Sequence, residues 1–231
     1  SDWSSDVCSS DLSVNSEQCA VTGNKTNHNY SLSTVSHQLK KCWQWNHNPV
    51  DAAWSLTERP GFLRLKTSRV VPNIYLAPNT LTQRMEGPTC SGNVCIDVSH
   101  MNDGDCCGLA AFNGDSGVLT VKRNGKKFTL TMSEQSVHLS EREKAVTRVD
   151  EKVVESVELQ LPGKSSTVWL RVDGDFNVGR DLATFYYSLD GGQWTKIGTD
   201  GYKMIFDYRR FFMVTNREAI ALNQDPAGIQ A

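Results

Sequence analysis

The sequence predicts an all-β fold, a sandwich of two sheets, on three observations. Short runs of alternating apolar and polar residues recur along most of the chain, separated by turn residues. Two of these separators, Asn124-Gly125 and Leu189–Gly192, join neighbouring runs in the way that β-hairpins do. The chain has 231 residues, which is enough for one large β domain. Many short strands with glycine and asparagine turns are typical of a sandwich or barrel.

Period-two alternation defines each predicted strand. In the first of them, Leu63 and Leu65 would face the core, while Arg64 and Lys66 would face solvent. The alternation at 157–161 ends at Pro162-Gly163, which breaks a strand. Together with 157–161, the predicted strands cover residues 61–67, 93–100, 117–123, 127–132, 167–173, 183–188 and 193–197.

Residues 134–155 are the exception, because they are charged and rich in Glu, Lys and Val. A short helix is one interpretation of this composition. Since strands are predicted on both sides, a long surface loop or ribbon is the preferred interpretation.

Composition excludes several classes of function. The 24 basic and 26 acidic residues give a formal net charge of −2, so no basic excess points to nucleic acid. No apolar run approaches the roughly 18 residues of a membrane span. We therefore expect neither nucleic acid nor a membrane as a partner. No signal peptide is visible, which leaves cytoplasmic, periplasmic and secreted locations open.

The seven cysteines do not form a recognisable metal or disulfide pattern. Cys90-x₄-Cys95 followed by Cys106-Cys107 matches no standard zinc spacing, and adjacent residues on a strand point to opposite faces. We interpret the cysteines as small buried apolar residues of a reduced compartment.

The N-terminal segment divides in two. Residues 1–12 are rich in Ser and Asp, and a common short-read sequencing adapter translates to Asp2–Leu12 without a mismatch, so a non-native, adapter-derived origin is predicted. Residues 13–38 are rich in Ser, Asn and Thr and are predicted to be a polar lead-in.

A series of short blocks carries a family resemblance. These blocks resemble, in the same order, the C-terminal concanavalin A-like domain of glycoside hydrolase family 43, the β-xylosidases and arabinofuranosidases. The resemblance places a jelly-roll β-sandwich at residues 39–213. The blocks are Trp43–Pro49, Trp54–Leu65, Asn79–Arg84, Asp103–Asp105, Gly108–Phe112, Leu170–Asp173 and Ala183–Gly191.

The resemblance implies an accessory function in hemicellulose breakdown. In that family the sandwich packs on a five-bladed propeller that holds the catalytic carboxylates, and no propeller sequence precedes Trp43. We therefore expect this chain alone not to be an enzyme, its partners being the propeller domain and a plant cell-wall oligosaccharide. The alternative is a carbohydrate-binding module for xylan-type polysaccharide, with exposed aromatic residues on one sheet face.

Residues 214–231 depart from the family pattern. Thr215–Pro226 resembles a segment near the end of the catalytic barrel in family 27 α-galactosidases. We therefore predict a foreign or chimeric tail after Met213, and a sandwich that lacks its last native strand or strands.

Five residues are candidates for substrate or interdomain contact. Trp45 and Trp169 offer aromatic rings on which a sugar can stack, although core packing is preferred for Trp45. His47 lies in a polar turn, where a hydrogen-bonded loop histidine is the preferred interpretation. Arg59 is expected to make an ion pair or to fix a turn. Arg84 is expected either to reach a carboxylate or to be solvated.

The acidic residues carry two weaker alternatives, and no cofactor is expected. Asp173 and Asp175 flank a glycine, which turn chemistry explains, but structural calcium bound by these carboxylates stays open. The EF-hand pattern fails, because Val178 and Thr184 stand where Gly and Glu are required. A self-standing glycosidase using Glu58 and Asp173 is the least favoured hypothesis.

Overall fold

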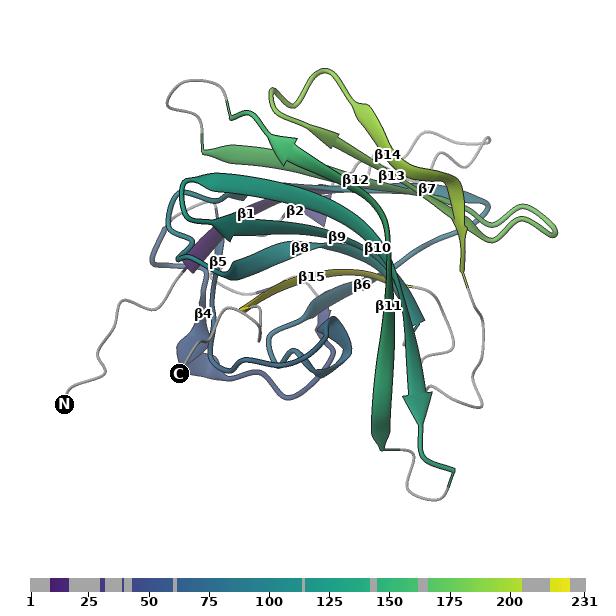
Figure 1. Cartoon of the computed structure of the whole chain (residues 1–231), viewed down its shortest axis with the longest axis horizontal. Coiled ribbons are helices and arrows are strands. Elements are labelled where there is room, and N and C mark those ends of the chain that lie inside the picture. The colour runs from purple at the N-terminus through teal and green to yellow at the C-terminus, as the bar shows by residue number, and fades with distance from the viewer. Residues whose placement is uncertain are drawn as a thin grey trace.

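The protein's structure, a computed structural model, describes most of the chain. It covers residues 9–16, 30–31, 39, 43–59, 62–113, 115–141, 145–161, 166–204 and 217–224, with only the backbone placed in 9–16, 30–31 and 217–224. Within these residues two antiparallel sheets form two layers (Figure 1). The concanavalin A-like sandwich predicted from the sequence is therefore confirmed, and no helix in the described part is long and apolar enough to cross a membrane.

One layer is an eight-stranded sheet, in which the paired strand β2 (Tyr30–Ser31) lies beside β1 off the main order. The main order is β14 (Thr195–Lys203), β13 (Leu182–Ser188), β12 (Thr167–Asp175), β7 (Thr89–Asp97), β1 (Ser9–Ser16), β5 (Leu63–Lys66) and β4 (Trp54–Ser55).

The other layer is a seven-stranded sheet. Two short 3₁₀ turns, η1 (Asp51–Ala53) and η2 (Ile74–Leu76), lie in the loops that precede its strand β6. The strand order is β11 (Val146–Leu159), β10 (Lys127–Leu139), β9 (Asp115–Asn124), β8 (Asp105–Asn113), β15 (Arg217–Gln224), β6 (Leu81–Arg84) and β3 (Trp43–Trp45).

The hydrophobic core lies between the two sheets, where period-two alternation places it. In β12, Val168, Leu170 and Val172 are fully buried, and the residues between them are half-buried. Leu119 and Leu130 are equally buried on the facing sheet. Alternate apolar residues thus determine which face of each strand turns inward.

The charged segment 134–155 forms a ribbon, not a helix. Strands β10 and β11 pair from Phe128 with Leu159 to Leu139 with Val146. Figure 1 shows this ribbon extending beyond the rest of the sheet. Its outer residues are polar because solvent lies on both sides of an extended ribbon.

The four described cysteines form no disulfide with one another and lie on different faces of the strands. Cys107 is buried in the core, whereas its neighbour Cys106 is half-buried on the outer face. Cys95 is buried, and burial raises the pKa of its thiol to about 11. Cys8, Cys19 and Cys42 lie outside the described residues.

Both segments predicted to be non-native contribute strands. The backbone of β1 includes residues 9–12 of the adapter-like segment and 13–16 of the lead-in, and it pairs with β5 and β7. The backbone of β15 lies inside the predicted foreign tail and pairs with β6 and β8. The sequence predicted a sandwich that lacks its last native strand or strands. In the structure, residues 217–224 of the tail form a strand between β8 and β6. The origin of both segments stays a prediction.

Candidate functional site

An aromatic patch lies on the outer face of the eight-stranded sheet; it consists of Trp169, Arg171, Tyr186 and Trp194. Arg171 and Tyr186 are direct partners across β12 and β13. The Arg171 guanidinium carbon lies 5.8 Å from the Tyr186 ring centre and 5.6 Å from that of Trp194. All four side chains are half-buried. These are the residue types that most often dominate binding energy at protein interfaces.

Two contacts fix the orientation of the patch. The Arg171 side chain donates to both carboxylate oxygens of Asp173, at 2.7 and 3.1 Å. A Cβ atom added at Gly191 would lie 2.9 Å from the Trp169 ring, so the turn after β13 packs closely on the indole. The patch is therefore held in place by its own sheet before any partner binds.

Arg59 joins the loop before β5 to the end of the internal strand β7, on the same face of the sheet. Its Nη1 donates to Asp97 Oδ2 at 2.8 Å, and its guanidinium lies over the Phe62 ring at 3.8 Å. Asp97 Oδ1 accepts from the Ser99 backbone and the Ser166 hydroxyl. Burial opposes ionisation of Asp97, but the hydrogen bonds from Ser99, Arg59 and Ser166 outweigh it and lower its pKa to about 2.

Asp97 should make folding stability depend on acid. A folded pKa below the unfolded value means that the stabilisation is present above about pH 4 and is lost as pH falls towards 2. Between pH 5 and pH 2 we expect the free energy of unfolding of the native chain to fall by about 2 kcal/mol through protonation of Asp97. The Asp97→Asn variant should not show this part of the fall. Urea unfolding at several pH values measures this difference.

The matched control is Asp200→Asn, because Asp200 is 97% exposed and pairs only with exposed Lys196 among the described side chains. Screening by solvent makes such pairs weak. We expect the control to keep the acid-dependent loss of the native chain. The same loss in Asp97→Asn would contradict a structural role for the Arg59–Asp97 pair.

Three other sequence candidates lie apart from the patch. Trp45 contacts Trp54 with ring centres 5.2 Å apart, which closes the sandwich between edge strands β3 and β4. His47 is exposed, and its Nε2 lies 2.7 Å from the Tyr75 carbonyl oxygen. Arg84 is exposed at the end of β6. The structure therefore does not bring Trp45, His47 and Arg84 together with Trp169.

The candidate carboxylates are each paired with cations. Asp173 binds Arg171, Asp175 binds Arg180, and Glu58 binds Lys66 and Arg64. These hydrogen bonds, chiefly from Lys66, lower the pKa of Glu58. Among described residues, no group of three His, Cys, Asp or Glu is placed to hold a metal. The arginine contacts make Asp173 and Asp175 a poor fit for calcium.

Glu58 and Asp173 do not form a hydrolytic pair. The cationic partners of Glu58 stand on β5, three strand positions from β12, which carries Asp173. Three spacings amount to roughly 14 Å. Glycosidase carboxylates act at about 5–9.5 Å from one another.

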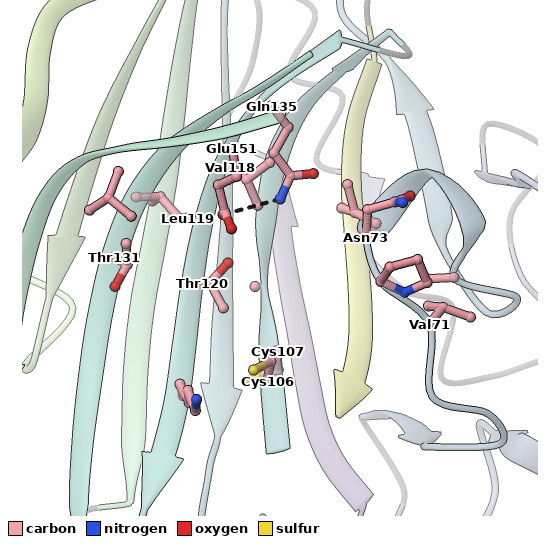
Figure 2. Close-up of a pocket in the computed structure, with 16 residues that line it drawn as sticks. Val71, Asn73, Cys106, Cys107, Val118, Leu119, Thr120, Thr131, Gln135 and Glu151 are labelled. Atoms are coloured by element: carbon pink, nitrogen blue, oxygen red, sulfur yellow. Dashed lines mark hydrogen bonds between the residues drawn. The ribbon is translucent and has the colours of Figure 1, made fainter. Parts of the chain in front are cut away.

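A groove of about 370 Å³ lies on the outer face of the seven-stranded sheet. Val71, Asn73 and Ile74, from the loop around η2, line one side, and Thr120 and Thr131 of β9 and β10 line the other. Gln135 and Glu151 stand at one end of it, joined by a hydrogen bond of 3.3 Å (Figure 2). The loop wall is apolar except for Asn73, whose Oδ1 accepts from the Leu76 backbone, whereas the strands supply hydroxyl, amide and carboxylate groups.

Sequence reasoning missed Arg171, Tyr186 and Trp194 as well as the whole groove. Alternation along β12 places Arg171 on the same face as Trp169, so this signal was present. Tyr186 and Trp194 require the register between strands. The groove requires the loop around η2 to lie over β8, through the Tyr75–Phe112 contact, and no local pattern predicts that.

Comparison with protein families gives a match to a known domain. The sequence model of the β-xylosidase C-terminal concanavalin A-like domain matches residues 35–213. Residues 1–34 and 214–231 lie outside the matched range.

Known relatives are larger proteins. A β-xylosidase of Formosa agariphila is 36% identical over 48% of this chain and 22% of its own length. A putative β-xylosidase of Xylanibacter ruminicola is 28% identical over 68% of this chain and 25% of its own length. The chain thus spans about a quarter of the curated relatives it matches.

Solved structures give the same picture. A bifunctional GH43-CE protein of Bacteroides eggerthii superposes with a TM-score of 0.69 and 37% identity, over 81% of this chain and 22% of that one. A GH43 glycoside hydrolase with endo-xylanase and exo-arabinofuranosidase activity, engineered at its active site, gives 0.71 and 27%, over 82% and 36%.

Proposed function

We propose a function for this chain on the basis of its family. The chain belongs to the β-xylosidase C-terminal concanavalin A-like domains. Its proposed function is that of the non-catalytic accessory domain of a family 43 glycoside hydrolase. In this proposal it packs on the propeller-shaped catalytic domain and shapes the active site, which cleaves xylose- or arabinose-containing hemicellulose. The match over residues 35–213, together with relatives of which the chain covers only 22% and 25%, is the observation that carries the proposal.

The aromatic patch is the surface proposed to contact the catalytic domain. Trp, Tyr and Arg side chains that are half-buried and held in place lose little conformational entropy on binding. Arg171 is already paired with Asp173, so binding would not bury an unpaired charge. The catalytic domain is the proposed partner of this patch, because family members of greater length carry this domain beside further sequence.

The cation-paired carboxylates support a non-catalytic function. A general acid in a glycosidase needs a raised pKa, and the pKa of both Asp97 and Glu58 is lowered. The alternative of a xylan-binding module loses Trp45, whose ring lies against Trp54 between the sheets, and would have to use the half-buried rings of the aromatic patch.

Two measurements test the proposal. The purified chain should not hydrolyse nitrophenyl β-xyloside or nitrophenyl α-L-arabinofuranoside; turnover that disappears on replacing one carboxylate would overturn the proposal. The chain should also bind the remainder of the Formosa agariphila β-xylosidase, produced without its matching region, in a calorimetric titration.

The patch variants make the second measurement specific. Trp169→Ala and Trp194→Ala, verified as folded by circular dichroism, should each weaken this association about tenfold or more. Lys127→Ala is the control, because Lys127 is exposed at the far turn of the other sheet. Equal binding by all variants would show that the patch is not the contact surface.

A further inference from the structure

The groove of the seven-stranded sheet has a fixed polar end. The Glu151 carboxylate accepts from the Ser133 hydroxyl at 2.7 Å and from Gln135 Nε2 at 3.3 Å. A carboxylate has about four acceptor positions, so Glu151 can still accept from a ligand. Thr131 is the cross-strand partner of Thr120 on β10 and β9, and both line the groove; the Thr131 hydroxyl lies 3.2 Å from that of Ser156. This row can hydrogen-bond several hydroxyl groups of one ligand.

Aliphatic side chains line both walls of the groove, beside Asn73 on the loop side. Val71 and Ile74 line the loop side. Val153 lines the opposite side and is 58% exposed; it is one of three exposed large apolar residues among those the structure describes. Aliphatic side chains facing each other across a polar floor suit a ligand that has C–H surfaces and a hydroxyl edge.

Size and charge narrow the ligand class. The volume of about 370 Å³ is near the lower end of the roughly 300–1,000 Å³ of small-molecule sites. Glu151 and Lys122 both line the groove, so it contains opposite charges. A neutral polyhydroxy ligand can donate to the carboxylate and accept from the ammonium group, whereas an anion or cation would meet one like charge.

We propose that this groove binds a short, neutral, xylose-containing oligosaccharide. Glu151, Gln135, Thr120 and Thr131 bind its hydroxyls, and Val71 and Val153 pack against its C–H faces. The xylose identity rests on the proposed function, whereas the neutral saccharide class rests on the groove alone. In the parent enzyme such a site would hold a hemicellulose fragment on the accessory domain, apart from the aromatic patch.

Calorimetric titration of the full chain with xylotriose tests this site. We expect millimolar-range binding that Glu151→Gln weakens about tenfold or more, because a hydrogen bond to a charged group is lost. Thr120→Val should weaken binding by a smaller factor, since it removes one neutral hydroxyl and keeps the shape. Circular dichroism verifies that both variants fold.

Two controls locate the ligand. Glu158→Gln changes a carboxylate on the same strand that pairs with Lys127, so binding should be unchanged. Trp169→Ala changes the aromatic patch and should also leave binding unchanged. In amide NMR spectra, xylotriose should shift the signals of Thr120, Gln135 and Glu151.

Several outcomes would overturn the inference. It fails if xylotriose does not bind, or if Glu151→Gln binds as tightly as the native chain. Loss of binding in Trp169→Ala alone would place the saccharide on the aromatic patch instead. Tighter binding of cellotriose than of xylotriose would keep the groove as a saccharide site and remove the xylose identity. Association with the catalytic domain is measured separately, so its failure is distinguishable from failure of this site.

Discussion

A chain that ends at Met213 should lose its cooperative unfolding transition, whereas a chain that ends at Gln224 should keep it. The difference is strand β15, which pairs along 217–224 with β8 and along 217–220 with β6. Without β15, no described strand lies between β6 and β8. Their backbone groups would then face one another across a gap of one strand.

The expected loss is comparable with the whole stability of a domain. Each backbone hydrogen bond contributes about 0.5–1.5 kcal/mol net, so the ladders on both sides of β15 amount to several kcal/mol. Domains of ordinary stability have about 5–15 kcal/mol in total. The shortened chain should therefore unfold or aggregate through its open strand edges.

Thermal melting with size-exclusion chromatography measures this effect. The control that ends at Gln224 removes 225–231 and retains β15, so it should melt as a single cooperative species. Equal melting of both truncated chains would contradict the pairing of β15 and would favour a sandwich that is complete without its tail.

Local alternation predicts the strands whose two faces differ. Leu63 and Leu65, or Val168 and Leu170, carry their own inside–outside signal, so β5 and β12 were predictable. Strand β8 is different, since Ala110, Ala111 and Phe112 are buried on both faces, by the core and by the loop around η2. A strand covered on both sides does not alternate, and its sequence therefore gives no period.

The two candidate binding surfaces were likewise only partly predictable from local sequence patterns. Trp169 was identified from its residue type, and Arg171 shares its face by alternation. Tyr186 joins them only through the β12–β13 register, which depends on the whole sheet. The groove unites Val71, Thr120 and Glu151 from segments far apart in the chain. Such a site becomes visible only when strand order is known.

Among single methyl additions on the groove floor, Gly108→Ala should lower the folding stability most. A Cβ atom at Gly108 would lie 1.8 Å from the Leu119 carbonyl oxygen and 2.9 Å from the carbonyl carbon. The obstacle is backbone within the β8–β9 ladder, where Gly108 pairs with Thr120. A side chain can rotate away from a new methyl group, but this carbonyl can move only if the two strands separate.

Overpacking against movable side chains already costs about 1–3 kcal/mol. We expect Gly108→Ala to cost about 3 kcal/mol or more, which lowers the melting temperature by roughly 6–12 °C in a domain of this size. Thermal and urea unfolding measure both quantities.

Gly192→Ala is the matched control, because its added Cβ meets its nearest atom, Asp190 Oδ1, at 3.7 Å. That is ordinary van der Waals contact in an exposed turn, so stability should stay within about 0.5 kcal/mol. Equal melting of the two variants would mean that β8 and β9 separate without cost. A folded but weaker Gly108→Ala protein that also binds xylotriose less tightly would instead connect the strand spacing to the groove, since Gly108 lines its floor.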